Sequence, residues 1–333
     1  MDAGDYDEGP MTEETKRISN VVSTKVNLAS NAIAGTIAGF TSSVLTHPLD
    51  VVKTRFQVHD GRASTVPKYR STLSALVTIG RTEGIRTLYA GLAPNLVGST
   101  VSWGSYFYAY NYMRGYARGF PEFVDSHGQT GPLINMSCAM LAGMCTCLAT
   151  NPIWLVKTRL QLQHGVSVEH RLTMTGMFSR VIRDEGFAGL YRGLVPSMML
   201  TSHGALQFMA YEEIKKVIIS YANDGDEHLS TIQTLFTATV SKTFASLVTY
   251  PSQVLRSRLQ QADPAFATAD PSLGPSRERY FKGTWDVFTK TLRHEGVRGF
   301  YKGLAPNLYR VIPSSAITFV TYENVARFLG AKT

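Results

Sequence analysis

Long uncharged stretches alternate with charged ones along this chain. Six windows of 19 or more residues together hold two charged side chains, Lys242 and Arg310. The windows cover residues 28–49, 92–113, 129–156, 193–211, 228–255 and 303–322. A helix of about 20 residues without uncompensated charge is long enough to cross the hydrocarbon core of a bilayer. The pattern therefore predicts six membrane-spanning helices.

The windows are not uniformly apolar, because Ser, Thr, Asn and Gly recur through them, as in residues 31–39 and 98–105. Helices of this composition place one face in lipid and another against protein or water. We therefore expect the helices to form a bundle with a polar interior.

Internal repetition predicts how the bundle is built. A ten-residue signature that begins with proline occurs at residues 48–57, 152–161 and 251–260. A Glu-Gly pair follows each signature, and a tyrosine lies six residues beyond each of these acids, Glu83, Glu185 and Glu295. Copies of about 100 residues indicate a repeat architecture. The fold class expected is an all-α membrane protein with six transmembrane helices in three tandem repeats, threefold pseudosymmetry and short charged amphipathic helices between them.

The repeated motifs also predict where the tail and each repeat begin and end. We expect an acidic N-terminal tail at 1–26, repeats at 27–120, 130–222 and 228–330, and a flexible loop at 262–279. A proline inside a helix removes a backbone hydrogen bond and kinks the helix. Each odd helix should therefore bend at its signature proline: Pro48, Pro152 or Pro251.

Composition excludes several classes of protein. Charged residues make up 17% of the chain, with a net charge of +8, and the positive residues are too dispersed to predict a nucleic-acid site. All three cysteines lie in one uncharged window and complete neither a disulfide framework nor a metal site, so no metal is expected. The acidic N-terminus resembles neither a signal nor a transit peptide, so targeting should be internal.

The triplicated signature, each copy followed by an aromatic residue and a glycine, resembles that of the mitochondrial carrier family over about residues 27–329. The resemblance implies a monomeric, multi-pass barrel in the mitochondrial inner membrane, in contact with lipid, that opens alternately to either side. Within the family, residues 201–212, 306–310 and 317–319 and Trp154 are most similar to FAD and folate carriers.

The resemblance assigns a gate on the matrix side to the signatures. Asp50 is the acid that remains there and is expected to pair with Lys157, while Trp154 and Gln253 occupy the other two acid positions. Lys53 and Arg256 then lack carboxylate partners. Three glutamines resemble braces beneath the pairs: Gln57, Gln161 and Gln260.

A second gate on the cytoplasmic side is implied by a shorter motif on the even helices. It is incomplete, because Asn111 and Ala326 break the pattern. The residues expected to form it are Arg114, Glu212, Lys215 and Glu323.

The two charges inside the windows indicate where a substrate binds. A charge at the membrane centre is costly and marks function, and two cations without an intramembrane carboxylate favour an anion. Arg310 falls at the family's contact position on the sixth helix, and Lys242 lies at a similar depth on the fifth. The remaining contact positions carry over to Gly98, Ser102 and Tyr106 on the second helix and to Leu200, Thr201 and Ala205 on the fourth.

Aromatic residues near these positions suggest how a ring would be held. Trp103 adjoins Ser102, and Tyr106 and Tyr110 follow Ser102 at helical spacing, so one helix face offers a stacking platform for a planar heterocycle. Packing or anchoring at the membrane interface is the alternative role of these aromatic residues. His203 is expected to be a packing or hydrogen-bonding residue.

These features together predict a transporter of an anionic heterocyclic cofactor, FAD or folate, which would be the transported substrate. NAD and pyrimidine nucleotide carriers share the same motifs and remain alternatives. A membrane-embedded enzyme is disfavoured because the windows contain no Asp or Glu. A soluble helical repeat protein is disfavoured because its helices would carry charge on their exposed faces.

Overall fold

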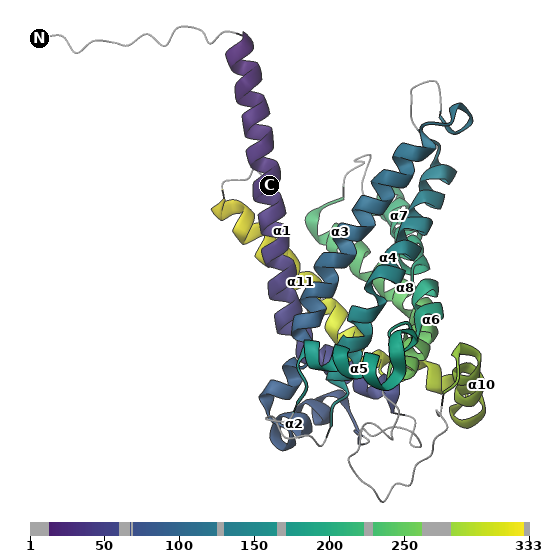
Figure 1. Cartoon of the computed structure of the whole chain (residues 1–333). Coiled ribbons are helices and arrows are strands. Elements are labelled where there is room, and N and C mark those ends of the chain that lie inside the picture. Colours follow the sequence, from purple (N-terminus) through teal and green to yellow (C-terminus); the bar gives the residue numbers. More distant parts are fainter. Residues whose placement is uncertain are drawn as a thin grey trace, which may run out of the picture. The chain divides into compact units, whose positions relative to one another are not determined.

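The regular elements of the computed structural model are helices (Figure 1). It describes residues 13–59, 67, 69–124, 130–164, 171–222, 229–261 and 281–329. The chain divides into two compact units, one of Met1–Leu45 with Ser314–Thr333 and the other of Thr46–Pro313. The only β pairing among the described residues is an isolated bridge between Val124 and Thr130. The all-α fold class predicted above is confirmed.

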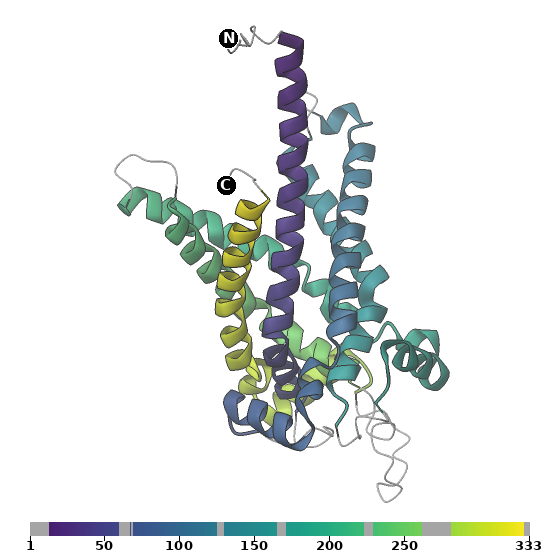
Figure 2. The same cartoon turned by 90° about the vertical axis from the view of Figure 1, so that its left-hand side faces the viewer.

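Each uncharged window corresponds to a helix or to a pair of helices, which Figure 2 shows from a second direction. Five windows give the single helices α1 (Glu13–Val58), α3 (Leu92–Ala117), α4 (Pro132–Gln161), α8 (Thr231–Gln260) and α11 (Leu304–Phe328). Among the described helices, α4 alone is both long and apolar enough to cross a membrane by length and composition, over Leu133–Gln161. The polar residues that lace the other windows lower their mean hydropathy.

The fourth window differs from the single helix expected. It forms α6 (Leu194–Met199) and α7 (Ser202–Ala222), with a break at Leu200 and Thr201. The Thr201 hydroxyl donates to the Met198 carbonyl oxygen at 2.7 Å, and the Ser202 hydroxyl to that of Met199 at 2.7 Å. Such local bonds compete with the backbone bonds of a continuous helix.

Helix α1 begins at Glu13 and so extends into residues assigned to the acidic tail. Residues 1–12 and the predicted loop at 262–279 lie outside the described residues. Pro48, Pro152 and Pro251 all lie inside helices, as does Pro313 in α11, which the repeat pattern did not single out.

Short amphipathic helices follow the signatures, namely α2 (Thr72–Thr82), α5 (Met174–Gly189) and α10 (Thr284–Glu295). Each packs against the signature helix of its own repeat. Ile79 of α2 contacts Val52 of α1, Val181 of α5 contacts Leu155 of α4, and α10 is placed likewise against α8. Burial of one apolar face therefore fixes each short helix beside its signature.

A glycine lies two residues after the repeated tyrosine of each copy and allows a close approach of the backbone. Gly91, Gly193 and Gly303 have φ values of 79°, 76° and 82°, which glycine alone adopts readily. A Cβ on Gly91 would lie 3.1 Å from the Lys157 carbonyl oxygen, and a Cβ on Gly193 would lie 3.3 Å from that of Arg256. Each glycine therefore lets its chain approach the signature helix of the next repeat, with Gly303 closing the cycle on α1.

Small residues also mediate packing in the unit that holds both ends of the chain. Ala34 of α1 and Ala326 of α11 are buried together. The hydroxyls of Ser42 and Ser314 lie 2.9 Å apart. Short side chains let two helices pack closely.

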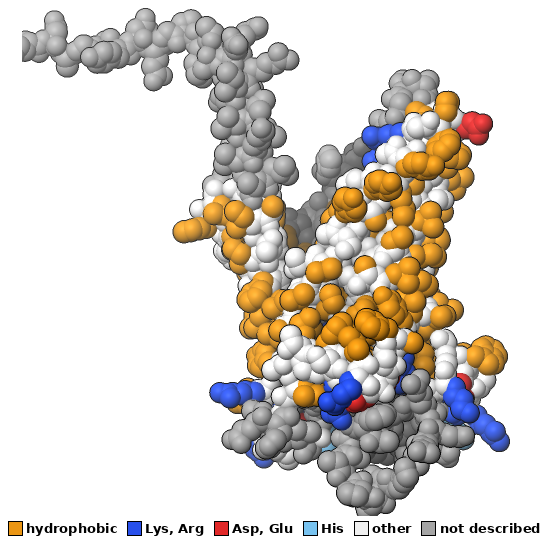
Figure 3. Space-filling model, viewed as in Figure 1, with side chains coloured by type: hydrophobic (Ala, Val, Ile, Leu, Met, Phe, Trp, Pro, Cys, Tyr) orange, Lys and Arg blue, Asp and Glu red, His pale blue; other side chains and the backbone are white. Residues whose placement is uncertain are grey.

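Side chains on the surface of the unit of Thr46–Pro313 agree with a membrane location. Figure 3 shows hydrophobic side chains spread over the visible faces of α3 and α4, with Lys and Arg side chains near their ends. The exposed apolar residues of these helices include Phe107, Tyr108, Met140 and Leu141. Large exposed apolar surfaces mark contact with lipid or with another protein.

Candidate functional site

The C-terminal ends of α1, α4 and α8 are joined in a ring of equivalent hydrogen bonds. Arg55 Nε donates to the Gln161 carbonyl oxygen at 3.2 Å, Arg159 to that of Gln260 at 3.2 Å, and Arg258 to that of Gln57 at 3.0 Å. The side-chain oxygens of the same glutamines accept hydroxyl donors from Thr54, Thr158 and Ser257 at 2.7–2.9 Å. This ring of Arg-to-Gln bonds links each repeat to the next.

The same arginines bind the acid of the Glu-Gly pair in their own repeat. Arg55 contacts Glu83 at 2.5 and 2.8 Å, Arg258 contacts Glu295 at 2.7 Å, and Arg159 pairs with Glu185. Because the arginine side chains are almost fully buried, removal of the acid would leave a buried charge unpaired. These pairs anchor α2, α5 and α10.

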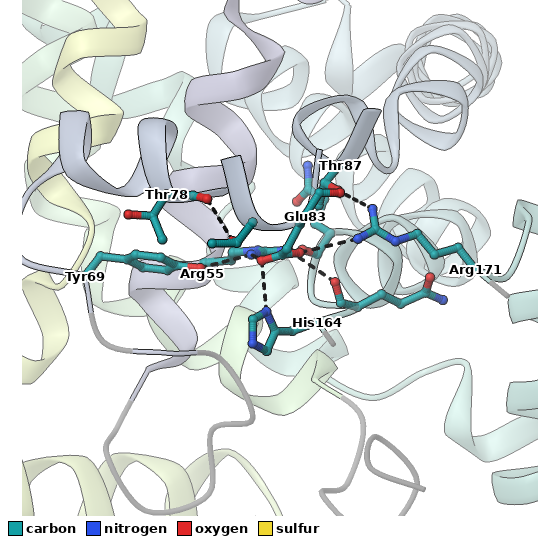
Figure 4. Close-up of polar contacts among 10 residues, drawn as sticks. Arg55, Tyr69, Thr78, Glu83, Thr87, His164 and Arg171 are labelled. Carbon is teal, nitrogen blue, oxygen red and sulfur yellow. Dashed lines mark hydrogen bonds and ion pairs between the residues drawn. The ribbon is translucent and has the colours of Figure 1, made fainter. Parts of the chain in front are cut away.

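Glu83 collects partners from two repeats (Figure 4). His164 Nδ1 lies 2.9 Å from Glu83 Oε1, and Arg171 lies 3.5 Å from Glu83 Oε2; both follow α4 in the chain. Burial alone would raise the pKa of Glu83, but the bonds from Arg55 and His164 outweigh it and lower the pKa to about 2. Glu83 therefore stays ionised at any physiological pH.

Asp50 and Lys157 form an ion pair above the ring. Lys157 Nζ lies 2.6 Å from Asp50 Oδ2, and both side chains are 13% exposed. Gln161 Nε2 donates to the same Asp50 oxygen at 3.0 Å. The pair thus joins repeats 1 and 2, and a hydrogen bond from Gln161 supports its carboxylate.

The other two positions of the expected matrix gate are filled differently. Lys53 Nζ donates to Gln253 Oε1 at 2.9 Å, which links repeats 1 and 3 through an amide. Lys157 and Arg256 lie over the Trp154 ring, 5.4 and 5.7 Å from its centroid.

Arg310 and Lys242 lie close to this gate. Arg310 Nε is 3.9 Å from Asp50 Oδ1, and Lys242 is within electrostatic range of Arg310. Lys53 is in range of Asp50 and of three other cations, Lys157, Arg256 and Arg310. We call these five positive residues the cation cluster: Lys53, Lys157, Lys242, Arg256 and Arg310. Of the five, Lys53, Lys157 and Arg310 are in range of the Asp50 carboxylate, which is the one acid that pairs with members of the cluster among the described residues.

The contact positions on α3 lie on one half-buried face. Ser102, Tyr106 and Tyr110 share it, and the rings of Tyr106 and Tyr110 stack with centroids 6.1 Å apart. The Ser102 hydroxyl is buried without a partner among the described residues. Trp103 lies instead on the exposed face of α3, 63% exposed and stacked on Phe107 at 5.7 Å. The face assigned to a ring is thus formed by tyrosines.

The contact positions of the fourth window lie at and just after the helix break. Leu200 and Thr201 are the residues between α6 and α7, and Ala205 is exposed on α7. His203 Nδ1 lies 3.0 Å from Thr249 Oγ1 of α8, so this histidine makes a hydrogen bond between helices.

The residues assigned to the cytoplasmic gate are arranged differently. Arg114 Nε donates to Thr130 Oγ1 at 3.4 Å, and no ion pair joins Arg114, Glu212 and Lys215 in the part of the chain that is described. Glu323 pairs with Arg327 on its own helix.

Sequence reasoning missed the paired arginines and the partners of Glu83. Arg55, Arg159 and Arg258 all stand at the eighth position of their signatures, so the repeat itself was a usable signal. Nothing in the repeat points to His164 or Arg171, which have no counterparts at equivalent positions.

Comparison with known proteins agrees with this architecture. The sequence profile of the family described as "Mitochondrial carrier protein" matches residues 24–120, 128–222 and 227–333. The folate transporter 1 of Arabidopsis thaliana, described as chloroplastic, is 44% identical over 90% of this chain and 95% of its own. The mitochondrial nicotinamide adenine dinucleotide transporter 1 of Saccharomyces cerevisiae is 38% identical, over 88% of this chain and 75% of its own.

A third relative, the mitochondrial pyrimidine nucleotide transporter RIM2 of Saccharomyces cerevisiae, is 34% identical over 89% of this chain and 85% of its own. All three relatives are named as transporters. Three matched repeats and relatives that are all named as transporters lead to one conclusion: this chain is a transporter of the mitochondrial carrier family.

Proposed function

We propose that the protein carries an anionic heterocyclic cofactor, folate or FAD, across the mitochondrial inner membrane. The observation that carries the proposal is the cation cluster, in which Lys53, Lys157 and Arg310 are in range of Asp50 while Lys242 and Arg256 are in range of other members of the cluster. Asp50 is the one carboxylate that pairs with members of the cluster among the described residues. Excess positive charge in a region shielded from water is costly and is best relieved by a ligand with two or more negative charges.

The aromatic face of α3 supports a ligand that also has a planar ring. Tyr106 and Tyr110 stack with ring planes 7° apart, and a flat heterocycle can extend such a stack. The unpartnered Ser102 hydroxyl on the same face would give the ring a hydrogen bond. A 44% identical relative named as a folate transporter supports the same class of substrate.

Transport would proceed by alternate opening of two gates. The matrix gate would be formed by the Asp50–Lys157 pair and the Lys53–Gln253 hydrogen bond, whereas no ion pair among the described residues joins Arg114, Glu212 and Lys215. This arrangement fits a state open on the cytoplasmic side. A substrate anion that takes over Lys157 and Arg310 from Asp50 would loosen the matrix gate, because a ligand shifts an equilibrium only through differential contacts.

NAD or a pyrimidine nucleotide is the alternative cargo, favoured by the relatives named for those substrates. We also propose that the protein works as a monomer surrounded by lipid. A chloroplastic relative makes the plastid envelope the competing location, and a fluorescent fusion imaged beside mitochondrial and plastid markers would decide between them.

The test is uptake by proteoliposomes that contain the purified protein. FAD, FMN, riboflavin, folate, NAD and UTP would be compared at equal concentration. We expect FAD or folate to be taken up fastest, and riboflavin, which has the ring without phosphate, to be taken up at the rate of empty vesicles. Preferred uptake of NAD or UTP would establish the alternative, and uptake of riboflavin equal to that of FAD would contradict the role of the cation cluster.

A pair of tyrosine variants tests the stacking face. Tyr106→Leu should reduce the uptake of FAD or folate at least tenfold, while Tyr106→Phe keeps the ring and most of the activity. Tyr108→Leu is the matched control, because Tyr108 is on the same helix but 76% exposed. Equal losses in Tyr106→Leu and Tyr108→Leu would exclude a specific stacking role.

A further inference from the structure

The second signature has an indole where the first has a carboxylate, and the surroundings of that indole support a further inference. Trp154 occupies the signature position that Asp50 occupies in repeat 1. Lys157 Nζ and Arg256 Cζ lie 5.4 and 5.7 Å from its ring centroid. At these distances a cation is attracted to the face of an aromatic ring. Trp154 thus contacts one cation of its own repeat and one of repeat 3.

Arg256 relies on this contact. No described carboxylate forms an ion pair with it, and Lys53 and Lys157 lie within electrostatic range and repel it. A guanidinium is planar and weakly hydrated, so it stacks well on an aromatic face. The indole is therefore the group that attracts Arg256 into the gate.

One neighbour of Trp154 marks the position as one that an acid would suit, and another packs against the indole. Gln260 is 1% exposed and its Nε2 has no hydrogen-bond partner among the described residues. The equivalent atom of Gln161 donates to Asp50, so a carboxylate at 154 would be the matching acceptor for Gln260. On the other side, a Cβ on Gly98 would lie 3.5 Å from Cε2 and Cζ2 of the indole, so the ring packs against the backbone of α3.

We infer that Trp154 is a positioning residue that holds Lys157 and Arg256 in the closed gate without neutralising their charge. An acid at 154 would hold the same cations, but it would cancel one positive charge of the cation cluster and repel an anionic substrate. The indole attracts Lys157 and Arg256, which gives the gate a third contact between repeats besides the Asp50–Lys157 and Lys53–Gln253 contacts. Because the indole is neutral, the cation cluster keeps its full positive charge. This inference rests on the proposed transport of an anion.

The test uses three replacements in the full-length protein: Trp154→Phe, Trp154→Leu and Trp154→Asp. The melting temperature in detergent without substrate should fall in the order Trp, Phe, Leu, because Phe attracts the two cations more weakly than Trp does and Leu has no aromatic ring to attract them. Trp154→Asp should keep or raise the melting temperature, since Asp can pair with Arg256 and Gln260. Trp285→Leu is the control, because Trp285 is 75% exposed on α10 and far in sequence from the signatures.

Uptake separates positioning from simple packing. For FAD and folate in proteoliposomes, Trp154→Asp should raise KM at least tenfold, whereas Trp154→Phe should keep KM within threefold of the wild type. Trp285→Leu should leave KM unchanged. A lower KM in the Asp variant would overturn the inference.

A double-mutant cycle tests the contact itself. In an Arg256→Met background the loss of melting temperature caused by Trp154→Leu should shrink by half or more. An undiminished loss would show that the ring only fills space, and the inference would then be wrong. If the wild-type protein takes up none of the tested cofactors, the proposed function fails, but the melting series and the cycle still decide the role of Trp154 in the gate.

Discussion

At the scale of single residues, the identity of a side chain matters most where the charges converge. Arg310 lies within 3.9 Å of Asp50 and in range of Lys53 and Lys242, so it connects the gate to the region where an anion would bind. It could be identified from sequence because a charge inside an uncharged window is conspicuous. Its distance from Asp50 could not, because that depends on how two repeats pack.

Replacement of Arg310 tests the substrate site. Arg310→Ala should abolish the uptake of anionic cofactors by proteoliposomes, because a bidentate guanidinium is lost, while the melting temperature stays near that of the wild type. Arg310→Lys should keep a small part of the activity. Arg293→Ala, an exposed arginine of α10, is the control, and near-normal uptake by Arg310→Ala would remove this residue from the site.

At the scale of elements, each short helix is fixed in the same way, by an apolar face, a buried Arg–Glu pair and a glycine in the left-handed region. The amphipathic pattern predicted α2, α5 and α10. The break between α6 and α7 was not predicted, because hydropathy does not register the hydroxyls of Thr201 and Ser202 that bond to nearby carbonyl oxygens. Roles assigned from resemblance for the cytoplasmic gate remain predictions.

Alanine substitutions at two glycines, one just before α3 and one inside it, should affect stability differently. Gly91→Ala should destabilise the protein by about 1–3 kcal/mol, because its φ is 79° and a Cβ would lie 3.1 Å from the Lys157 carbonyl oxygen. Gly104→Ala inside α3 meets no atom within 4 Å and should be neutral or stabilising. Thermal unfolding in detergent measures both, and equal effects would contradict the close approach at Gly91.

The Glu83 cluster predicts a pH dependence. Glu83→Gln should cost about 3–5 kcal/mol at neutral pH, because Arg55 is 0% exposed and loses its carboxylate. The folded pKa of Glu83 is about 2, below its ordinary value of 4.5. Its contribution is therefore present above pH 4.5 and is lost as the pH falls toward 2. The difference in melting temperature between wild type and variant should narrow over that range, and a constant difference would contradict the shift.

At the scale of the whole molecule, the repeats are held together by contacts at the acid position of each signature, and the chemical type of this contact differs from one repeat to the next. The position of the acid gives an ion pair in repeat 1, an indole contact in repeat 2 and a hydrogen bond to a side-chain amide in repeat 3. The sequence allowed the first to be anticipated, because an acid and a base stand at matching positions of repeats 1 and 2. The two cations on Trp154 required the positions of α4 and α8 to be known.

Exchange of the charges in the first of these contacts tests the link between repeats 1 and 2. Asp50→Lys alone should abolish transport and lower the melting temperature, because it adds a positive charge to the cation cluster and leaves Lys157 unpaired. Asp50→Lys with Lys157→Asp should recover part of both, since the pair is rebuilt in reverse. A double variant no better than the single one would count against direct pairing.

The ring of Arg-to-Gln bonds is closed, because each signature helix donates one of these hydrogen bonds through its arginine and accepts another through its glutamine carbonyl oxygen. In a linear array an outer unit can fray while the rest stays folded. In a closed circuit, the withdrawal of any one member breaks two links at once. We therefore expect the three signature ends to separate in one concerted step and a protein lacking a single repeat to lose the circuit entirely.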